Sequence, residues 1–160
     1  MFNLRLNVVA TDDRIRLQIN EQGFSSFRAT PGSAAYDLHA CGLPGYSYTV
    51  LEPGETRMID TGLSVHISSP GFCALIVPRS GTASKKKLAP INSPGLIDSD
   101  YQGPLKIALH NFGDAPASIE DFERVAQLLF IPCVAVTATL VEAHEVATAR
   151  AEGGFGSTGA

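Results

Sequence analysis

The sequence predicts an all-β domain with a jelly-roll-like barrel or sandwich as its architecture. Short apolar segments, often rich in β-branched residues, dominate the sequence, and this pattern is typical of β-strands. Turn pairs with glycine or proline separate these segments, among them Pro53-Gly54, Pro70-Gly71 and Gly103-Pro104. The chain has 160 residues, enough for one domain with a full hydrophobic core. We therefore expect many short strands and little helix.

Each element is expected from its local pattern. Residues 2–8 and 14–19 alternate apolar and polar side chains, which is the period of a half-buried strand. Further strands are expected at residues 63–67, 72–77, 105–109 and 134–140. One short helix is expected at residues 81–87. Residues 121–130 have helix-like spacing, but the apolar run 128–131 favours a strand in the second half.

Composition excludes several classes of protein. The net charge of −4 argues against a general nucleic-acid-binding protein, for which a basic excess is expected. A small anionic ligand remains compatible, because it needs only local positive charge. The N-terminus has no continuous apolar run, and Gln127, Pro132 and Thr137 interrupt residues 125–141. We expect no signal peptide, no membrane span and no nucleic-acid partner.

The cysteines and histidines show no metal-binding pattern. Cys41, Cys73 and Cys133 are far apart, and no C-x-x-C motif occurs. Apolar or small residues flank each of them, which is typical of buried thiols in a reducing compartment. The four histidines lie in different segments without ligand spacing. The sequence predicts a cytoplasmic protein with three buried thiols and no direct metal site.

The last eleven residues, Arg150 to Ala160, are glycine-rich but carry one aromatic residue and one cation. Glycines allow the backbone to approach anionic oxygens, and Phe155 can stack on a base while Arg150 binds phosphate. A flexible arm with these groups suits a ligand that has a flat ring and phosphates. By composition alone, a glycine- and serine-rich linker or disordered tail is the better interpretation, because such tails are common.

A second candidate anion site is the segment Pro78-Arg79-Ser80-Gly81. It follows an expected strand and precedes the expected helix, so Ser80 is expected at the N-cap, with Arg79 and free backbone N–H groups beside it. The alternative is an ordinary helix cap with a surface arginine.

The segment 95–103 places two carboxylates and a tyrosine between turn residues. A β-hairpin here, next to the strand at 105–109, presents backbone groups that can read the edge of a pyrimidine. Asp98 is the candidate general base for a water molecule. Ordinary turn chemistry is the alternative explanation for Asp98 and Asp100.

Two polar residues occur within apolar segments. Asp37 lies in a strand-like stretch, where a lone carboxylate needs a partner, a metal ion or an edge position. Gln127 lies within the apolar run after Arg124, where it is either a satisfied core amide or a phosphate donor.

The order of these segments is more specific than any one of them. The motifs A-x-Y-D-L, P-R-S-G, G-L-I-D-x-D-Y-x-G, R-V-A-Q-L and R-x-x-G-G-F-G-S-T-G occur in that order between residues 34 and 159. The chain thereby resembles the trimeric dUTPase (deoxyuridine triphosphate nucleotidohydrolase) family, with a bacterial character. The resemblance implies a jelly-roll-like subunit, residues 1–149, with a substrate-closing arm, residues 150–160.

The same resemblance implies an activity and a homotrimer with each active site at a subunit interface. The family hydrolyses dUTP to dUMP and pyrophosphate with Mg²⁺, which keeps uracil out of DNA and supplies dUMP for dTMP synthesis.

It also implies roles for individual residues. Asp98 activates water for attack on the α-phosphorus, and Tyr101 packs on the deoxyribose and excludes a ribose 2′-hydroxyl. Asp37 contacts the metal through water. The phosphate ligands are Arg79, Ser80, Gly81, Gln127 and Arg150, and the uracil is read by Asn92, Gly95, Leu96 and Ile97 and covered by Phe155.

Three positions depart from the family pattern. Ala151 stands where glycine is usual, so the arm is expected to be stiffer there. Lys87 and Ile91 also replace glycines that related bacterial chains often have, so the loop before residue 95 is expected to differ. No motif is assigned to residues 42–49.

Two other functions remain open at this point. The related dCTP deaminases share the fold, but they need a catalytic glutamate where this chain has Asp98. A non-catalytic interaction module is the other alternative. The joint presence of Asp98, Arg79, Tyr101 and Phe155 argues against it.

Overall fold

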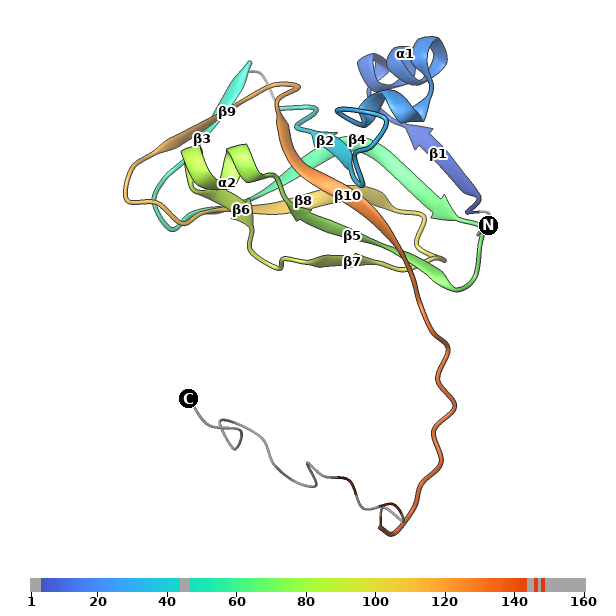
Figure 1. The fold of residues 1–160 in the computed structure, drawn as a ribbon. Helices are drawn as coiled ribbons and strands as arrows, with labels where there is room; N and C mark the ends of the chain where they lie inside the picture. The colour runs from blue at the N-terminus through green and yellow to red at the C-terminus, as the bar shows by residue number, and fades with distance from the viewer. Residues whose placement is uncertain (1–3, 44–46, 144–145, 147, 149–160) are drawn as a thin grey trace.

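The structure is a computed structural model, and it describes residues 4–43, 47–143, 146 and 148 (Figure 1). Ten strands and two α-helices make up most of this part of the chain. The strands are β1 (Leu6–Ala10), β2 (Tyr36–His39), β3 (Tyr48–Leu51), β4 (Thr56–Ile67), β5 (Phe72–Pro78), β6 (Leu88–Pro90), β7 (Gly95–Ile97), β8 (Pro104–Asn111), β9 (Ala117–Glu120) and β10 (Arg124–Pro132). The helices are α1 (Asp13–Gln22), the 3₁₀ turn η1 (Phe24–Phe27) and α2 (Ser80–Lys86).

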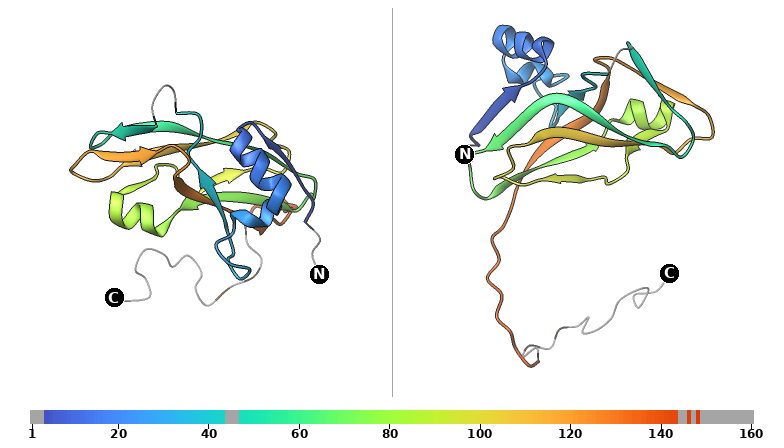
Figure 2. Two further views of the ribbon diagram at one scale, coloured as in Figure 1. Left: turned by 90° about the horizontal axis from the view of Figure 1, so that it is seen from above. Right: turned by 180° about the vertical axis from the view of Figure 1, so that it is seen from behind.

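Antiparallel pairing joins these strands into three sheets. The two larger sheets have the strand orders β1-β4-β8-β6 and β2-β10-β5-β7, and β3 pairs with β9. Both four-stranded sheets supply residues to one core, including Leu63 and Ile107 from the first and Leu38 and Leu128 from the second. Each such side chain contributes roughly 1.5–3 kcal/mol by its burial. The all-β, jelly-roll-like prediction is confirmed (Figure 2).

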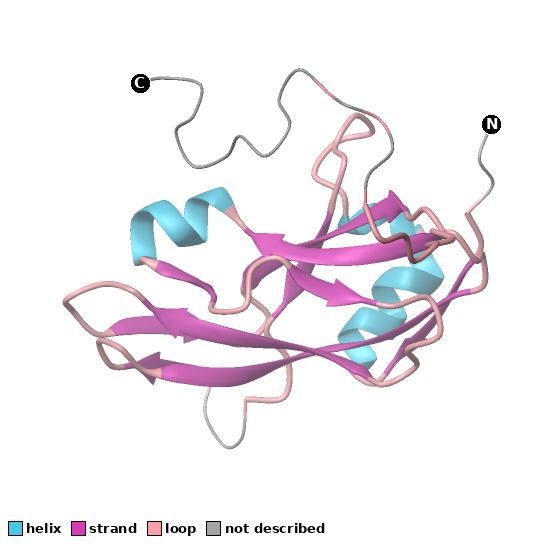
Figure 3. Ribbon diagram, turned by 90° about the horizontal axis from the view of Figure 1, so that it is seen from below, coloured by secondary structure: helices cyan, strands magenta, loops and turns pink. Residues whose placement is uncertain are grey.

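The strand predicted at residues 14–19 is wrong, because this segment lies in helix α1. Asp12 caps the helix, accepting a hydrogen bond from the backbone N–H of Arg14 at 2.9 Å. Ile15 is fully buried and Ile19 packs against the core, whereas Leu17 is 58% exposed. The buried positions therefore repeat every four residues, as in a helix. The described residues contain two α-helices where one was expected, and these helices lie at opposite ends of the molecule (Figure 3).

The strand predicted at residues 134–140 is also wrong. β10 ends at Pro132, and the described residues that follow contain no strand. Figure 1 shows this segment leaving the body of the molecule in an extended path. Val134, Val136 and Leu140 are 82–100% exposed, so the apolar pattern here has no partner within the described part of the chain.

Other predictions are confirmed with shifted ends. Residues 81–87 were expected to form a helix, and α2 spans Ser80–Lys86. The second half of 121–130 is indeed strand, since β10 begins at Arg124. The N-terminal strand begins at Leu6. No helix in the described ranges is long and apolar enough to cross a membrane.

The backbone conformation differs at Lys87 and Ile91, the two positions before residue 95 where related chains often have glycine. Lys87 terminates α2 in the left-handed conformation, with φ 57° and ψ 24°, and its backbone N–H donates to the carbonyl of Thr82. Glycine is favoured at such a position because it has no Cβ. Ile91 is not among the described non-glycine residues with positive φ, so nothing in its backbone conformation calls for glycine.

We predict that Lys87→Gly stabilises the protein by about 0.5–1 kcal/mol, because it removes the left-handed strain of a residue with a Cβ. Lys85→Gly is the matched control on the exposed face of α2. It places glycine within the helix and is expected to cost about 1 kcal/mol. Thermal and urea unfolding measure both changes. A Lys87→Gly protein that is no more stable than wild type would show that the left-handed turn carries no strain.

Candidate active site

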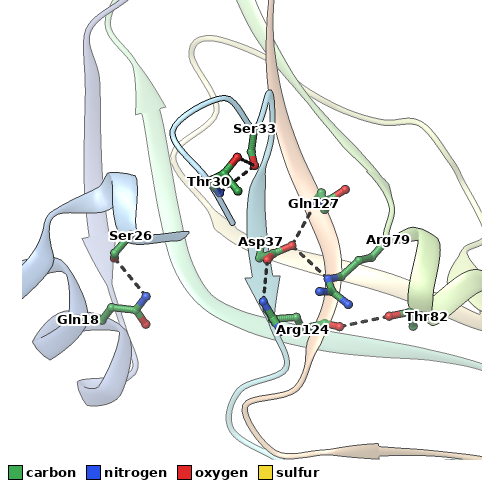
Figure 4. Close-up of polar contacts among 9 residues, drawn as sticks. All are labelled: Gln18, Ser26, Thr30, Ser33, Asp37, Arg79, Thr82, Arg124 and Gln127. Atoms are coloured by element: carbon green, nitrogen blue, oxygen red, sulfur yellow. Dashed lines mark hydrogen bonds and ion pairs between the residues drawn. The ribbon is translucent and has the colours of Figure 1, made fainter. Parts of the chain in front are cut away.

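One half of the candidate site is a buried carboxylate surrounded by nitrogen donors, here called the Asp37 cluster (Asp37, Arg79, Arg124 and Gln127). Asp37 Oδ1 accepts hydrogen bonds from Arg79 Nε at 3.2 Å and from Gln127 Nε2 at 3.1 Å. Arg124 Nη1 donates to Asp37 Oδ2 at 3.4 Å. The Asp37 side chain is only 5% exposed. The partners that a buried carboxylate requires are thus two guanidinium groups and an amide (Figure 4).

A β-bulge allows Arg124 and Gln127 to reach the same carboxylate. Side chains three residues apart on a regular strand point to opposite faces. On β10 the register against β2 shifts between Arg124 and Ala126, and Gln127 then lies directly opposite Asp37. The extra residue returns both side chains to one face. Arg124 was absent from the predicted site residues, although its motif was recognised, because its direction depends on this bulge.

The third donor, Arg79, comes from the end of β5. Ala126 and Gln127 of β10 pair with Pro78 and Val77 of β5, so the residue after Pro78 lies beside the cluster. The carbonyl of Arg79 accepts a hydrogen bond from the N–H of Ala83, which makes Arg79 the N-cap of α2. The prediction that Ser80 is the N-cap is therefore wrong, and Ser80 is the first residue of the helix.

Ser80 and Gly81 lie next to the Arg79 side chain. Ser80 is exposed, and a Cβ added to Gly81 would lie 3.5 Å from Arg79 Nη1. Thr82, buried one residue further along α2, donates its hydroxyl to the carbonyl of Arg124 at 3.2 Å. The helix start is thus attached to β5 through the chain and to β10 through this hydrogen bond.

His39 lies two residues beyond Asp37 on β2 and is 8% exposed. Its ring stacks on Phe122 and meets Phe27 edge-on. Burial lowers the pKa of His39 to about 4; the nearby Asp37 carboxylate opposes this shift, and the guanidinium groups around the cluster reinforce it. The imidazole is therefore neutral at pH 7.

The other half of the candidate site is a groove of about 460 Å³, here called the Asp98 groove. Its lining residues come from β4, from β7 and the turn after it, and from β8: Met58, Leu96, Ile97, Asp98, Tyr101, Pro104, Leu105 and Lys106. The Asp98 side chain is exposed to solvent, and its backbone carbonyl accepts a hydrogen bond from the N–H of Tyr101 at 3.2 Å. A water molecule can therefore reach the carboxylate beside an aromatic ring.

The Tyr101 ring is held by its own loop. Its hydroxyl donates to the carbonyl of Pro104 at 3.0 Å. A Cβ on Gly103 would lie 2.4 Å from the Tyr101 hydroxyl oxygen, so only glycine leaves room for the ring at this place. The tyrosine is thereby fixed as one wall of the groove, with 42% of its surface exposed.

The segment before Asp98 does not close the two-stranded hairpin that the sequence predicted. β7 pairs with β5 through Ile97 opposite Ala74 and Gly95 opposite Ile76, whereas β6 and β8 belong to the other large sheet. Within this segment Gly95 is buried and Leu96 is 60% exposed. Asn92 is exposed, and its Nδ2 lies 3.4 Å from the position that a Cβ on Gly95 would take.

The two halves lie at opposite ends of β5. Ile97 of β7 pairs with Ala74 of β5, and Arg79 lies five residues after Ala74 in the sequence. At about 3.4 Å per residue this is a separation of roughly 17 Å. One subunit therefore presents two separate half-sites, and the two remaining predicted residues, Arg150 and Phe155, lie outside the described residues.

The fold and the two half-sites define a jelly-roll-like β protein with a donor-rich cluster and a groove of about 460 Å³ that carries an exposed carboxylate. A sequence profile of the dUTPase family matches residues 21–159. The chain belongs to the dUTPase family.

Relatives with curated names agree with this membership. The deoxyuridine 5'-triphosphate nucleotidohydrolase of Tolumonas auensis is 48% identical over 131 residues, which cover 82% of this chain and 84% of that protein. The protein of the same name from Thiobacillus denitrificans is 44% identical over 155 residues, which cover 96% and 99%.

A solved structure is similar over nearly the whole length. It is the dUTPase of Staphylococcus bacteriophage 80alpha with dUPNHPP, which is 28% identical with a TM-score of 0.78. The match covers 98% of this chain and 99% of that chain.

We predict that His39 makes the protein less stable as the pH falls from about 6.5 to 4. In this interval the unfolded chain binds a proton on histidine that the folded chain excludes, so unfolding is favoured by about 1–2 kcal/mol once solvent screening is allowed for. His39→Phe, which keeps the ring stack, is expected to reduce this loss. Urea unfolding at pH 7 and pH 4.5 measures it, with His66→Gln as the control. An unchanged pH dependence in His39→Phe would contradict the assignment.

Proposed function

We propose that this protein hydrolyses dUTP to dUMP and pyrophosphate. The observation that carries the proposal is the pair of half-sites, one suited to a nucleoside with an activated water and the other to a polyphosphate. Membership of the dUTPase family supports it. In the cell this reaction would keep uracil out of DNA and supply dUMP for dTMP synthesis, and we propose a cytoplasmic location.

Asp98 acts as the general base in this proposal. Its exposed carboxylate accepts a proton from water, and the resulting hydroxide attacks the α-phosphorus in line with the departing pyrophosphate. Tyr101 packs on the deoxyribose and leaves no room for a 2′-hydroxyl, since its ring is held between Gly103 and the carbonyl of Pro104. Asn92 and the backbone of residues 95–97 read the uracil edge.

The Asp37 cluster binds the phosphates. Arg79 contacts Asp37 through Nε, so among the described contacts its two terminal nitrogens are left to bind phosphate oxygens. Its side chain is 28% exposed, which allows a ligand to reach it. Gln127, Ser80 and Gly81 complete the phosphate contacts, and Arg124 holds the second oxygen of Asp37. These donors offset the charge that develops on the leaving pyrophosphate.

Mg²⁺ is the proposed cofactor. The side chains of the Asp37 cluster would not hold it alone, so it would be bound mainly by the phosphate oxygens of the substrate. Within the described residues no three acidic, histidine or cysteine side chains are grouped to hold a metal ion. Mg²⁺ commonly keeps several waters and binds phosphate oxygens with one or two carboxylates. Asp37 is the carboxylate of this half-site, and its proposed contact with the ion is through a water molecule. When bound, the ion supplies positive charge to the polyphosphate.

We further propose a homotrimer in which half-sites of neighbouring subunits face each other. Arg79 lies roughly 17 Å along β5 from Ala74, the partner of Ile97, and Asp98 follows Ile97 in the direction away from Arg79. In one chain the two residues are therefore separated by far more than the span from the α- to the γ-phosphorus. The exposed apolar residues Val134, Val136 and Leu140 need a covering surface, which another copy of the chain can supply. Residues 150–160 serve as the closing arm, with Arg150 on phosphate and Phe155 over uracil.

We predict that Asp98→Asn lowers turnover of dUTP by about 10²–10⁴-fold and leaves dUTP binding largely intact, because the amide cannot take the proton. Pyrophosphate release and equilibrium binding of a non-hydrolysable dUTP analogue measure the two effects. Asp114→Asn, the same change in an exposed turn, is the control. Near-normal turnover in Asp98→Asn would exclude Asp98 as the base.

The same assay distinguishes the related activities. We expect pyrophosphate from dUTP and much less from dCTP, dTTP and UTP. Release of ammonia from dCTP would instead identify a deaminase.

The expected assembly is a trimer in solution. Sedimentation equilibrium at several protein concentrations is the measurement, combined with activity at the same concentrations. An active monomer would contradict the proposal that two subunits complete each site.

A further inference from the structure

Two cysteines lie side by side where the chain leaves the second large sheet. β10 pairs with β5 through Ile131 opposite Cys73 and Pro132 opposite Phe72. One residue later the N–H of Cys133 donates to the carbonyl of Gly71 at 2.6 Å, so the pairing continues past the end of β10. Cys133 is therefore diagonal to Cys73 on the same face of the ladder. The two side chains are close enough to interact, because the Cys133 thiol contributes to raising the pKa of Cys73.

The two thiols differ in accessibility. Cys73 is 6% exposed, whereas Cys133 is exposed, so the expectation of three buried thiols is wrong for Cys133. Burial raises the pKa of Cys73 to about 11, and the neighbouring Cys133 thiol adds to this shift. Cys133 is thus the thiol that a dissolved oxidant meets first, and Cys73 is the protected partner behind it.

The third cysteine has a different environment. Cys41 is buried, and its backbone N–H donates to the carbonyl of Asp60 on β4, in the other large sheet, at 2.8 Å. Burial raises its pKa to about 12. It therefore serves as an internal reference for the reactivity of the pair.

We propose that Cys73 and Cys133 form a redox-active thiol pair that a hydroperoxide converts reversibly into an intrachain disulfide. The bond attaches the start of the C-terminal segment, residues 134–143, to β5. Ile97 lies opposite Ala74, so the bond forms one strand away from the turn that begins at Asp98. This inference concerns the thiols alone and does not depend on the proposed dUTP hydrolysis.

The chemistry proceeds in two balanced steps. The Cys133 thiolate attacks one peroxide oxygen, the O–O bond breaks, and the other oxygen leaves as water or an alcohol after taking a proton. The Cys73 thiol then attacks the sulfenic sulfur of Cys133, forming the S–S bond while the S–O bond breaks and water departs. The two thiols are oxidised by two electrons and the peroxide is reduced by two; an added dithiol reverses the bond.

The experiment treats the full-length protein with hydrogen peroxide and maps its peptides by mass spectrometry under non-reducing conditions. We expect a crosslinked peptide pair containing Cys73 and Cys133, two hydrogens lighter than its reduced parts, that disappears on treatment with dithiothreitol. Cys41 is expected to stay reduced. Cys133→Ser should abolish the crosslink and leave Cys73 reduced. Cys73→Ala should leave Cys133 as a sulfenic acid that dimedone traps.

Two results would overturn the proposal. In one, wild-type Cys133 accumulates as sulfenic or sulfinic acid without the crosslink. In the other, the disulfide joins Cys133 residues of two different chains.

Discussion

The pairing of β5 with β10 on one side and β7 on the other is the constraint on which the candidate site depends. Through β10 it places Gln127 and the end of β5 beside Asp37, and through β7 it places the Asp98 turn near the opposite end. A slip of one residue in either register would turn these side chains to the other face. Fully buried residues such as Leu128 and Ala126 hold that register, because the slip would expose them.

Within this frame the Asp37 carboxylate organises the half-site that we propose binds phosphate. A buried carboxylate without partners is costly, so its three donors are fixed before any ligand arrives. The same cations help to keep His39 neutral, and the bulge on β10 is what allows Arg124 to take part. Because the donors already surround one anion, the proposed polyphosphate substrate would meet side chains that need little reorganisation.

The sequence predicted the fold class and most strands, because apolar segments and glycine- or proline-containing turns are local signals. It failed where a pattern had two explanations: Ile15 and Ile19 fit both a strand and a helix, and only packing against the core decides. Residues 134–140 have a strand pattern but no partner strand in the described chain. The role of Arg124 and the distance between the half-sites could not be predicted, since a bulge and a strand register fix them.

The central claim is that Asp98 of one subunit works with Arg79 of another. Mixing Asp98→Asn and Arg79→Ala subunits by co-refolding tests it directly, since each variant alone should be nearly inactive towards dUTP. If each site draws the two residues from different subunits, random mixing in equal amounts restores about one quarter of wild-type turnover. If both residues act within one chain, every chain in the mixture carries a defect, and the activity stays at the level of the separate variants.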